Sequence, residues 1–495
     1  MPNPGGIYLG CERCRCRRIK CDRAKPQCQR CVKYGTTCPG YPQPQDVRFR
    51  HETSKVTAKA EHFAAVDQRL PRGLELVPSL PEERNLNCNR SANKSLDLQL
   101  APYVAQSWDT ALTQFFFDQV LMPVGWYSHL PQLHYQAPPD SCIRVTISAA
   151  SLFVAANQSN DAGMLQKARR TYGAALQAIN SSIAHPERCL EDETLACVLL
   201  LHVLDHLTGN SSVPNMSHLN ACAQLVKMRE AKGFRTRRTH DLAHSVVIQA
   251  QPWLMQGLPV DGGTLGNEAI HKWLWMLTSQ TPAARMAALS LEVGRLRNRA
   301  IGLLTHGIHG ISSLIHSLDH LIEDIVSLEA RIADWQTHCE PRWVQMKTAL
   351  RTPNGEETQA SYYSDTQVSK VWNYWRVSRI TLHSMMISLV DHGQSHQISI
   401  PGRNLDAMKA NSAQIINSMI SEIVASVPFH LQQIDTRGRP STQRSQRVLG
   451  GFALIWPLQM LLSCKWSLAC HKTVAVETLH VISNVFGISQ ARLSL

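Results

Sequence analysis

The sequence lacks any long uninterrupted apolar run. Its 495 residues contain no window of 18 consecutive apolar residues, and the most apolar stretches, LACVLLLHVLDHL and ALIWPLQMLL, are too short or contain His and Asp. The N-terminal stretch MPNPGGIYLGCER also lacks the basic and then apolar pattern of a secretory signal peptide. We therefore expect no membrane partner, and a reducing compartment in which clustered cysteines bind metal more often than they form disulfides.

The common catalytic signatures are missing as well. The chain has no G-x-S-x-G, no P-loop and no G-x-G-x-x-G. Two histidine pairs, His202 with His206 and His316 with His320, have the i, i+4 spacing with which one helix can bind zinc, but neither has a third ligand or a general-base Glu beside it. We expect no catalytic residues and no enzymatic activity, with His316 and His320 facing solvent.

Acidic residues are scarce at one end of the chain. Residues 1–60 hold 13 Lys and Arg against 4 Asp and Glu, a net charge of +9, whereas the other 435 residues hold 37 against 34, a net charge of +3. A nearly neutral body with a strongly basic head indicates that the head meets a polyanion. Nucleic acid is the first candidate and an anionic membrane surface is the second; of the two we predict nucleic acid, with no membrane partner.

The basic head also concentrates cysteine. Seven of the fifteen cysteines lie in residues 11–38, and two halves, CERCRCRRIKC and CQRCVKYGTTC, share the frame C-x2-C-x6-C. Each half offers three thiolates, whereas tetrahedral zinc takes four ligands, so six sulfurs can hold two zinc ions only if two of them bridge. The repeat makes the first cysteine of each half the natural bridge, and the predicted ligands are Cys11, Cys14, Cys21, Cys28, Cys31 and Cys38.

Two other interpretations concern the same cysteines. A six-cysteine disulfide knot is the alternative to zinc, and the missing signal peptide and the regular spacing argue against it. The seventh cysteine, Cys16, would lie some 200° around a helix from Cys14 and could not share its zinc. We predict that Cys16 is a tolerated small residue without a special role. The second hypothesis is that the flanking Arg15 and Arg17 lower the pKa of its thiol, so that oxidation of Cys16 blocks DNA binding.

The spacing, the basic run CRCRRIKC and Pro26 between the halves resemble the fungal zinc binuclear cluster transcription factors. The resemblance implies two Zn²⁺ ions and a first short helix that lies in the DNA major groove, typically over a CGG-like triplet. It places Arg17 and Arg18 at the base-reading end, with Arg15 and Lys20 in DNA contact or support. The family often has Lys at the position of Arg18, and Arg preserves a preference for guanine with a different reach.

A linker is predicted after the cysteines. Residues 39–100 are rich in proline and polar residues, which is typical of a flexible, partly disordered tether. Many relatives have a dimerising coiled coil at this place. Here Val56, Phe63 and Leu70 are spaced by heptads, but Lys59 and Pro71 limit the pattern to two heptads at most, so a homodimer remains an open alternative.

The remainder, residues 101–495, has helical periodicity with little strand-like alternation. In residues 311–335 the apolar residues alternate at intervals of three and four, which suits a coiled-coil seam; Ile315 and Ile322 widen the stripe, so we favour packing within the chain over dimerisation. Cys464 and Cys470 are predicted to be small core residues. Stretches such as KARRTYGAALQAI and GGFALIWPLQMLL resemble the regulatory region of the same fungal family, which implies an all-α domain that relays or restrains transcription.

The predicted fold is a small zinc-cluster domain, with two short helices around two zinc ions, joined by a flexible linker to a large all-α domain. The domains are 1–10 (disordered), 11–38 (zinc cluster), 39–100 (linker) and 101–495 (helical). The predicted function is a nuclear, sequence-specific regulator that binds double-stranded DNA, contacts the transcription machinery and controls a metabolic or secondary-metabolite gene set. The alternatives are a basic module that binds RNA or a protein partner, and an enzyme in the helical body.

Overall fold

The computed structural model describes most of the helical body and part of the cysteine head. The described residues are 11, 13–14, 17, 19, 21–22, 24, 27–39, 108–121, 124–208, 217–230, 236–257, 281–306, 311–351, 357–441 and 448–491. The chain divides into two compact units, Met1–Ala58 and Lys59–Leu495. Most of the predicted linker, including the heptads at residues 56–70, lies outside the described residues.

The first unit has a core made of sulfur. Six buried cysteines form its only described cluster, and Ile19 is the partly buried apolar residue that packs against them. Its helices are short: residues 13–14 are helical, and α2 spans Gln29–Lys33. So small an apolar core cannot stabilise a fold by itself, which is why metal binding is expected to supply the folding energy.

The second unit is mostly helical, as predicted. Its N-terminal half is built around α6 and α8, because α6 packs against both α7 and α8, and α8 packs against α9. The α8 sequence is apolar around most of its circumference, so it lies buried in the core. After a helix at residues 108–115, the elements of this half are η1 (Phe116–Val120), η2 (Gly125–His129), α5 (Leu130–Gln136), α6 (Cys142–Ser159), α7 (Ala162–Ala184), η3 (Arg188–Leu190), α8 (Asp192–Thr208) and α9 (Ser217–Glu230).

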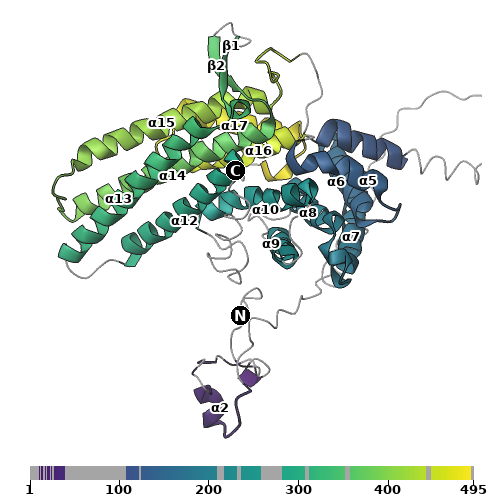
Figure 1. Ribbon diagram of the computed structural model, residues 1–495, viewed down its shortest axis with the longest axis horizontal. Coiled ribbons are helices and arrows are strands. Elements are labelled where there is room, and N and C mark those ends of the chain that lie inside the picture. The colour runs from purple at the N-terminus through teal and green to yellow at the C-terminus, as the bar shows by residue number, and fades with distance from the viewer. Residues whose placement is uncertain are drawn as a thin grey trace, which may run out of the picture. The chain divides into compact units, whose positions relative to one another are not determined.

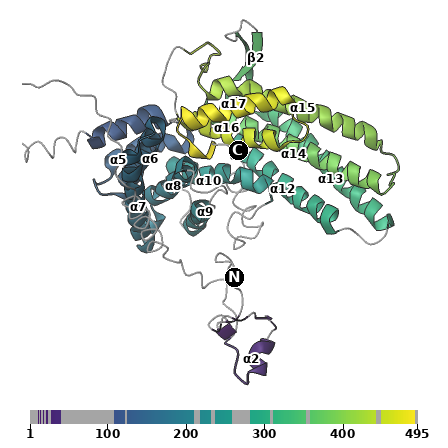
Figure 2. The same ribbon diagram turned by 180° about the vertical axis from the view of Figure 1, so that it is seen from behind.

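The C-terminal half is a bundle of long helices. The central helix is α14, which contacts α12, α13, α15 and α16, and both views show the long helices running side by side (Figures 1 and 2). The elements are α12 (Pro282–His306), α13 (Ile311–Trp335), η4 (Gln336–His338), η5 (Pro341–Trp343), α14 (Thr366–Ser395), α15 (Leu405–His430), α16 (Val448–Ser463), α17 (Ala469–Asn484) and η6 (Ser489–Ala491).

The apolar seam of α13 is buried inside this bundle. Seven of its eight predicted positions, from Leu314 to Trp335, are buried, while Ile311 in the first turn is exposed. The helix packs against α12 and α14 of the same chain. The prediction of packing within the chain is therefore confirmed, and this seam is not available to a second copy.

Two details differ from the sequence prediction. An antiparallel hairpin of β1 (Met346–Arg351) and β2 (Glu357–Tyr362) packs against α15, so the domain is mostly helical rather than all-α. Its two strands have six residues each, too few for a clear period-2 signal. Cys464 is buried as predicted, but Cys470 is exposed because the first turn of α17 faces solvent.

Helix α10 (Arg237–Met255) joins the two halves. It contacts α8 and α9 on one side and α12 and α14 on the other. Its C-terminal end is held on α12, where Arg297 donates to the carbonyl of Gln256 at 2.6 Å. The approach is closest at Gly294, where an added Cβ would overlap the carbonyl oxygen of Leu254. Only glycine fits there without moving one helix away from the other.

Two glycines of α12 give a matched test of this junction. Gly294→Ala should lower the free energy of unfolding of the helical domain by about 2 kcal/mol or more, because the methyl group has no space. Gly302→Ala, where nothing lies within 4 Å of the added Cβ, should raise it by about 0.5–1 kcal/mol through better helix propensity. Urea denaturation of the full chain measures both, and equal effects would contradict the close packing of α10 on α12.

Candidate metal centre and nucleic-acid interface

The structure brings six sulfurs of the head together. The Sγ atom of Cys11 lies 3.7 Å from that of Cys28 and 3.7 Å from that of Cys31. The Sγ atom of Cys14 lies 3.8 Å from that of Cys28. Zinc–sulfur bonds of about 2.3 Å in a regular tetrahedron give edges of about 3.8 Å, so these separations suit sulfurs that share a zinc ion.

The sulfurs fall into two groups of four. Within each group all ligand atoms lie within 4.8 Å of one another. The groups are Cys11, Cys14, Cys21 and Cys28, and then Cys11, Cys28, Cys31 and Cys38. Cys11 and Cys28 occur in both, so two tetrahedral ions fit these six sulfurs when that pair bridges.

The backbone supports the two shared sulfurs in the same way. The amide of Cys14 donates to the Sγ atom of Cys11 at 3.5 Å, and the amide of Cys31 donates to the Sγ atom of Cys28 at 3.3 Å. Each hydrogen bond runs from the amide of the second cysteine of a C-x2-C pair to the sulfur of the first. The two halves of the sequence repeat therefore share this local geometry. Amide donors at a bridging thiolate stabilise its negative charge.

Burial sets the protonation of these thiols. It raises the pKa of Cys11 to about 12 and also raises the pKa of Cys14 and of Cys28. Thiols of this kind keep their protons near neutral pH unless a cation lies beside them. The donor set therefore fits a soft divalent ion that takes sulfur ligands, and zinc is the ion for which the spacing is typical.

The four predicted DNA-contacting cations are described only in part. Arg17 is exposed, and its guanidinium lies 3.6 Å from the centre of the Tyr34 ring. This contact joins the first half of the repeat to the second, since Tyr34 follows α2. Arg15, Arg18 and Lys20 lie outside the described residues, as does Cys16.

A second link between the halves was not predicted from the sequence. Nη1 of Arg13 donates to the carbonyl of Thr37 at 3.1 Å, 24 residues along the chain. In addition, the carboxylate of Asp22 accepts a hydrogen bond from the amide of Gln29 at 3.0 Å, at the start of α2. Arg13 and Asp22 thus have structural contacts in the head.

The histidine pairs give no metal group in the described part of the chain. His316 and His320 are exposed, as predicted, with their Nε2 atoms 3.1 Å apart, and His202 is buried, whereas the side chain of His206 is not described. Among the described residues of the body, one group of three donors lies together: Cys142, Glu193 and Cys197. The sequence could not suggest it, because packing of α6 on α8 brings these residues together.

Comparison with known families matches both parts of the chain. Residues 9–48 match the fungal Zn(2)-Cys(6) binuclear cluster domain, and residues 117–255 match the fungal specific transcription factor domain. The second match ends at the last residue of α10, so the C-terminal bundle lies beyond it.

Two curated relatives are similar over short stretches. "Putative transcription factor ecdB" of Aspergillus rugulosus is 22% identical over 154 residues, which are 31% of this chain and 26% of that protein. "Pestheic acid cluster transcriptional regulator 3" of Pestalotiopsis fici is 31% identical over 111 residues, which are 21% of this chain and 20% of that protein. The similarity thus spans about a quarter of each relative's length or less. No solved structure matches the chain at a significant level.

The chain therefore carries a fungal zinc-cluster domain followed by a fungal regulatory domain. This pair of domains is the one found in fungal Zn(2)-Cys(6) transcription factors, to which the chain is similar over residues 9–48 and 117–255. A binuclear cluster of this family implies two zinc ions, and the two sulfur groups are positioned for them. None of the described helices is both long enough and apolar enough to cross a membrane.

Zinc content tests the shared sulfurs. We expect about two zinc ions per chain in the purified protein, and close to none in a Cys28→Ser protein, because that change removes a ligand from both ions. Cys16→Ser and Cys197→Ser serve as controls and should keep two. Metal analysis of the gel-filtered protein gives the counts, and a Cys28→Ser protein with two ions would contradict a bridging role.

Proposed function

We propose that this chain is a nuclear, sequence-specific DNA-binding regulator of transcription. In this proposal the two zinc ions are held by Cys11, Cys14, Cys21, Cys28, Cys31 and Cys38, with the first cysteine of each half bridging. The ions fold the head and place its first helix in the DNA major groove. The base-reading and supporting cations are Arg15, Arg17, Arg18 and Lys20, and the preferred site is a CGG-like triplet.

The observation that carries the proposal is the pair of four-sulfur groups that share two cysteines within a basic segment. A guanidinium can donate two hydrogen bonds to O6 and N7 of guanine, which is the commonest specific contact in the major groove. Stacking of Arg17 on Tyr34 engages the face of its guanidinium, and the N–H groups at the edge of a stacked guanidinium can still donate to a base. This arrangement would fix the direction of that edge before DNA arrives.

The helical body is proposed to relay regulation from the DNA-bound head to the transcription machinery. One relative is named as a regulator of the pestheic acid cluster, which supports a secondary-metabolite gene set as the target. A homodimer would need a surface other than the α13 seam, which is buried in the chain.

Selection of bound duplexes from a random pool, followed by titration of the selected sequence, tests the base-reading role. Arg17→Ala should weaken binding to the selected duplex by about 5-fold to 150-fold, since one good bidentate contact contributes about 1–3 kcal/mol of discrimination. Arg30→Ala is the matched control: its side chain is exposed on α2, carries the same charge and is not a predicted base contact. It should change affinity far less.

Binding measurements without zinc and at different salt concentrations distinguish this function from the alternatives. Removal of zinc should abolish specific binding, and the selected duplex should be preferred over random DNA by at least 10³-fold at moderate salt. Affinity that is equal for all sequences and falls only with salt would contradict sequence-specific recognition. A preference for RNA under the same conditions would instead support the basic interaction module.

Genome-wide mapping of bound sites tests the target class. The proposal predicts bound CGG-like sites in promoters of a biosynthetic gene cluster, with transcript levels of that cluster changed in a deletion strain. Binding confined to promoters of unrelated genes would contradict the secondary-metabolite target and leave the DNA-binding role intact.

A further inference from the structure

A pocket lies where the two halves of the helical body meet. Its walls come from four segments that are far apart in the sequence: η2 with the residues just before it, α10, α14 and α16. The enclosed space is about 50 Å³, and it opens to solvent. It is too small for a large cofactor, and a ligand with one ring would fill it and remain partly exposed at the mouth.

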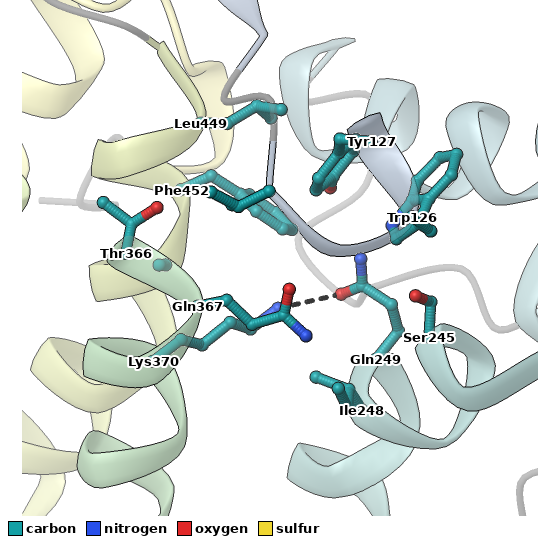
Figure 3. Close-up of a pocket in the computed structure, with 12 residues that line it drawn as sticks. Trp126, Tyr127, Ser245, Ile248, Gln249, Thr366, Gln367, Lys370, Leu449 and Phe452 are labelled. Carbon is teal, nitrogen blue, oxygen red and sulfur yellow. Dashed lines mark hydrogen bonds between the residues drawn. The ribbon is translucent and has the colours of Figure 1, made fainter. Parts of the chain in front are cut away.

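The walls combine aromatic rings with a few polar groups. Trp126 and Tyr127 of η2 lie on one side and Phe452 of α16 on another, while Gln249, Gln367 and Lys370 point into the space between them (Figure 3). An apolar pocket with a small number of converging polar groups is the usual form of a small-molecule site.

Lys370 is the charged group in this pocket. Its ammonium donates to Oε1 of Gln249 at 3.1 Å and lies 5.6 Å from the ring centres of both Tyr374 and Phe452. Among the described residues, no carboxylate forms an ion pair with it. Burial lowers the pKa of Lys370 from 10.5 to about 8, because the charged form loses its water without gaining an anion.

The neighbouring titratable groups do not supply that anion. Burial raises the pKa of Tyr127 on η2 and of Tyr374 on α14, so both phenols stay neutral at pH 7. Burial also lowers the pKa of His430 on α15 to about 3, and the positive charges of Arg376 and Lys370 lower it further, so this imidazole is neutral too. The pocket therefore holds one positive charge, surrounded by neutral rings and amides.

Lys370 is partly buried at the wall of this open pocket, and charges that lose water on burial are usually paired in proteins. A bound anion would supply the partner that the described residues do not. We propose that this pocket binds a small aromatic monocarboxylate, with its ring between Trp126, Tyr127 and Phe452 and its carboxylate paired with Lys370. One lysine matches one negative charge, so a phosphate group or a dicarboxylate would bring a charge that nothing in the described pocket neutralises.

The bound carboxylate would touch both halves of the regulatory body at once. Trp126, Tyr127 and Gln249 belong to the half matched by the transcription factor domain, and Lys370 and Phe452 belong to the C-terminal bundle. A ligand here would hold the halves together and stabilise the body. The site is independent of zinc and DNA and goes beyond the function proposed above.

Calorimetric titration of the zinc-loaded full chain with benzoate, phenylacetate and 3-phenylpropionate tests the proposal. At least one should bind saturably at pH 7, and benzamide, which has the same ring and no charge, should bind at least tenfold more weakly. Lys370→Met should lose at least tenfold in affinity for the carboxylate. It should still fold, because Met has a similar volume and removes a buried charge.

Lys409→Met is the matched control. Lys409 is a half-exposed lysine of α15 that pairs with Asp391, so its loss should leave carboxylate affinity unchanged. Specific DNA binding by Lys370→Met in the absence of ligand should equal that of the wild type, which separates failure of the pocket from failure of the head. Affinity for the carboxylate should also fall as the pH rises through about 8, because Lys370 of the free protein then loses its proton.

Three results would overturn the proposal: no saturable binding of any of the three carboxylates, equal binding of benzamide, or equal binding by the Lys370→Met protein. A protein that binds all of these compounds alike would have an apolar pocket in which the lysine plays no part.

Discussion

Six sulfurs buried within residues 11–38 form the core of the head, and metal ions are the partners that would hold them together as thiolates. The described head has no larger apolar core that could stabilise its fold, since Ile19 is the apolar side chain packed against the cysteines. The short α2, the hydrogen bonds from backbone amides to the shared sulfurs and the contacts of Arg13 and Arg17 across the repeat all surround that cluster. We therefore expect metal binding and folding of the head to be one process.

The same constraint explains the composition of the segment. Six thiolates and two Zn²⁺ ions leave a net charge of −2, which surrounding arginines and lysines offset. In the proposed function these cations serve the cluster as well as the DNA. Arg17 has a structural contact already, because its guanidinium lies on the Tyr34 ring.

The sequence predicted which six cysteines lie together because they are close in the chain. All six lie within one repeated frame, and the structure gathers the same six sulfurs into two groups that share Cys11 and Cys28. Their roles as zinc ligands and as the bridging pair stay predictions. The seam of α13 was predictable for the same reason, since its period is carried within one helix. Short elements and single exposures were harder to predict. The hairpin β1–β2 has too few residues for a periodic signal, and Cys470 was assigned to the core although His471 and Lys472 follow it.

The pocket could not be predicted from the sequence at all. Trp126, Gln249, Lys370 and Phe452 are separated by roughly a hundred residues from one to the next, and each alone suits an ordinary helix surface or core. Their meeting depends on how α10 lies against both halves of the body, which is a matter of tertiary packing. The group of Cys142, Glu193 and Cys197 also depends on tertiary packing, because it forms where α6 packs against α8.

X-ray absorption at the zinc edge tests the central claim most directly. The account predicts that each zinc in the purified protein has four sulfur neighbours at about 2.3 Å, with a second zinc closer than about 4.6 Å, the largest separation that a shared sulfur permits. Nitrogen or oxygen in the first coordination shell, or the absence of a zinc neighbour within that distance, would contradict a cluster bridged by Cys11 and Cys28.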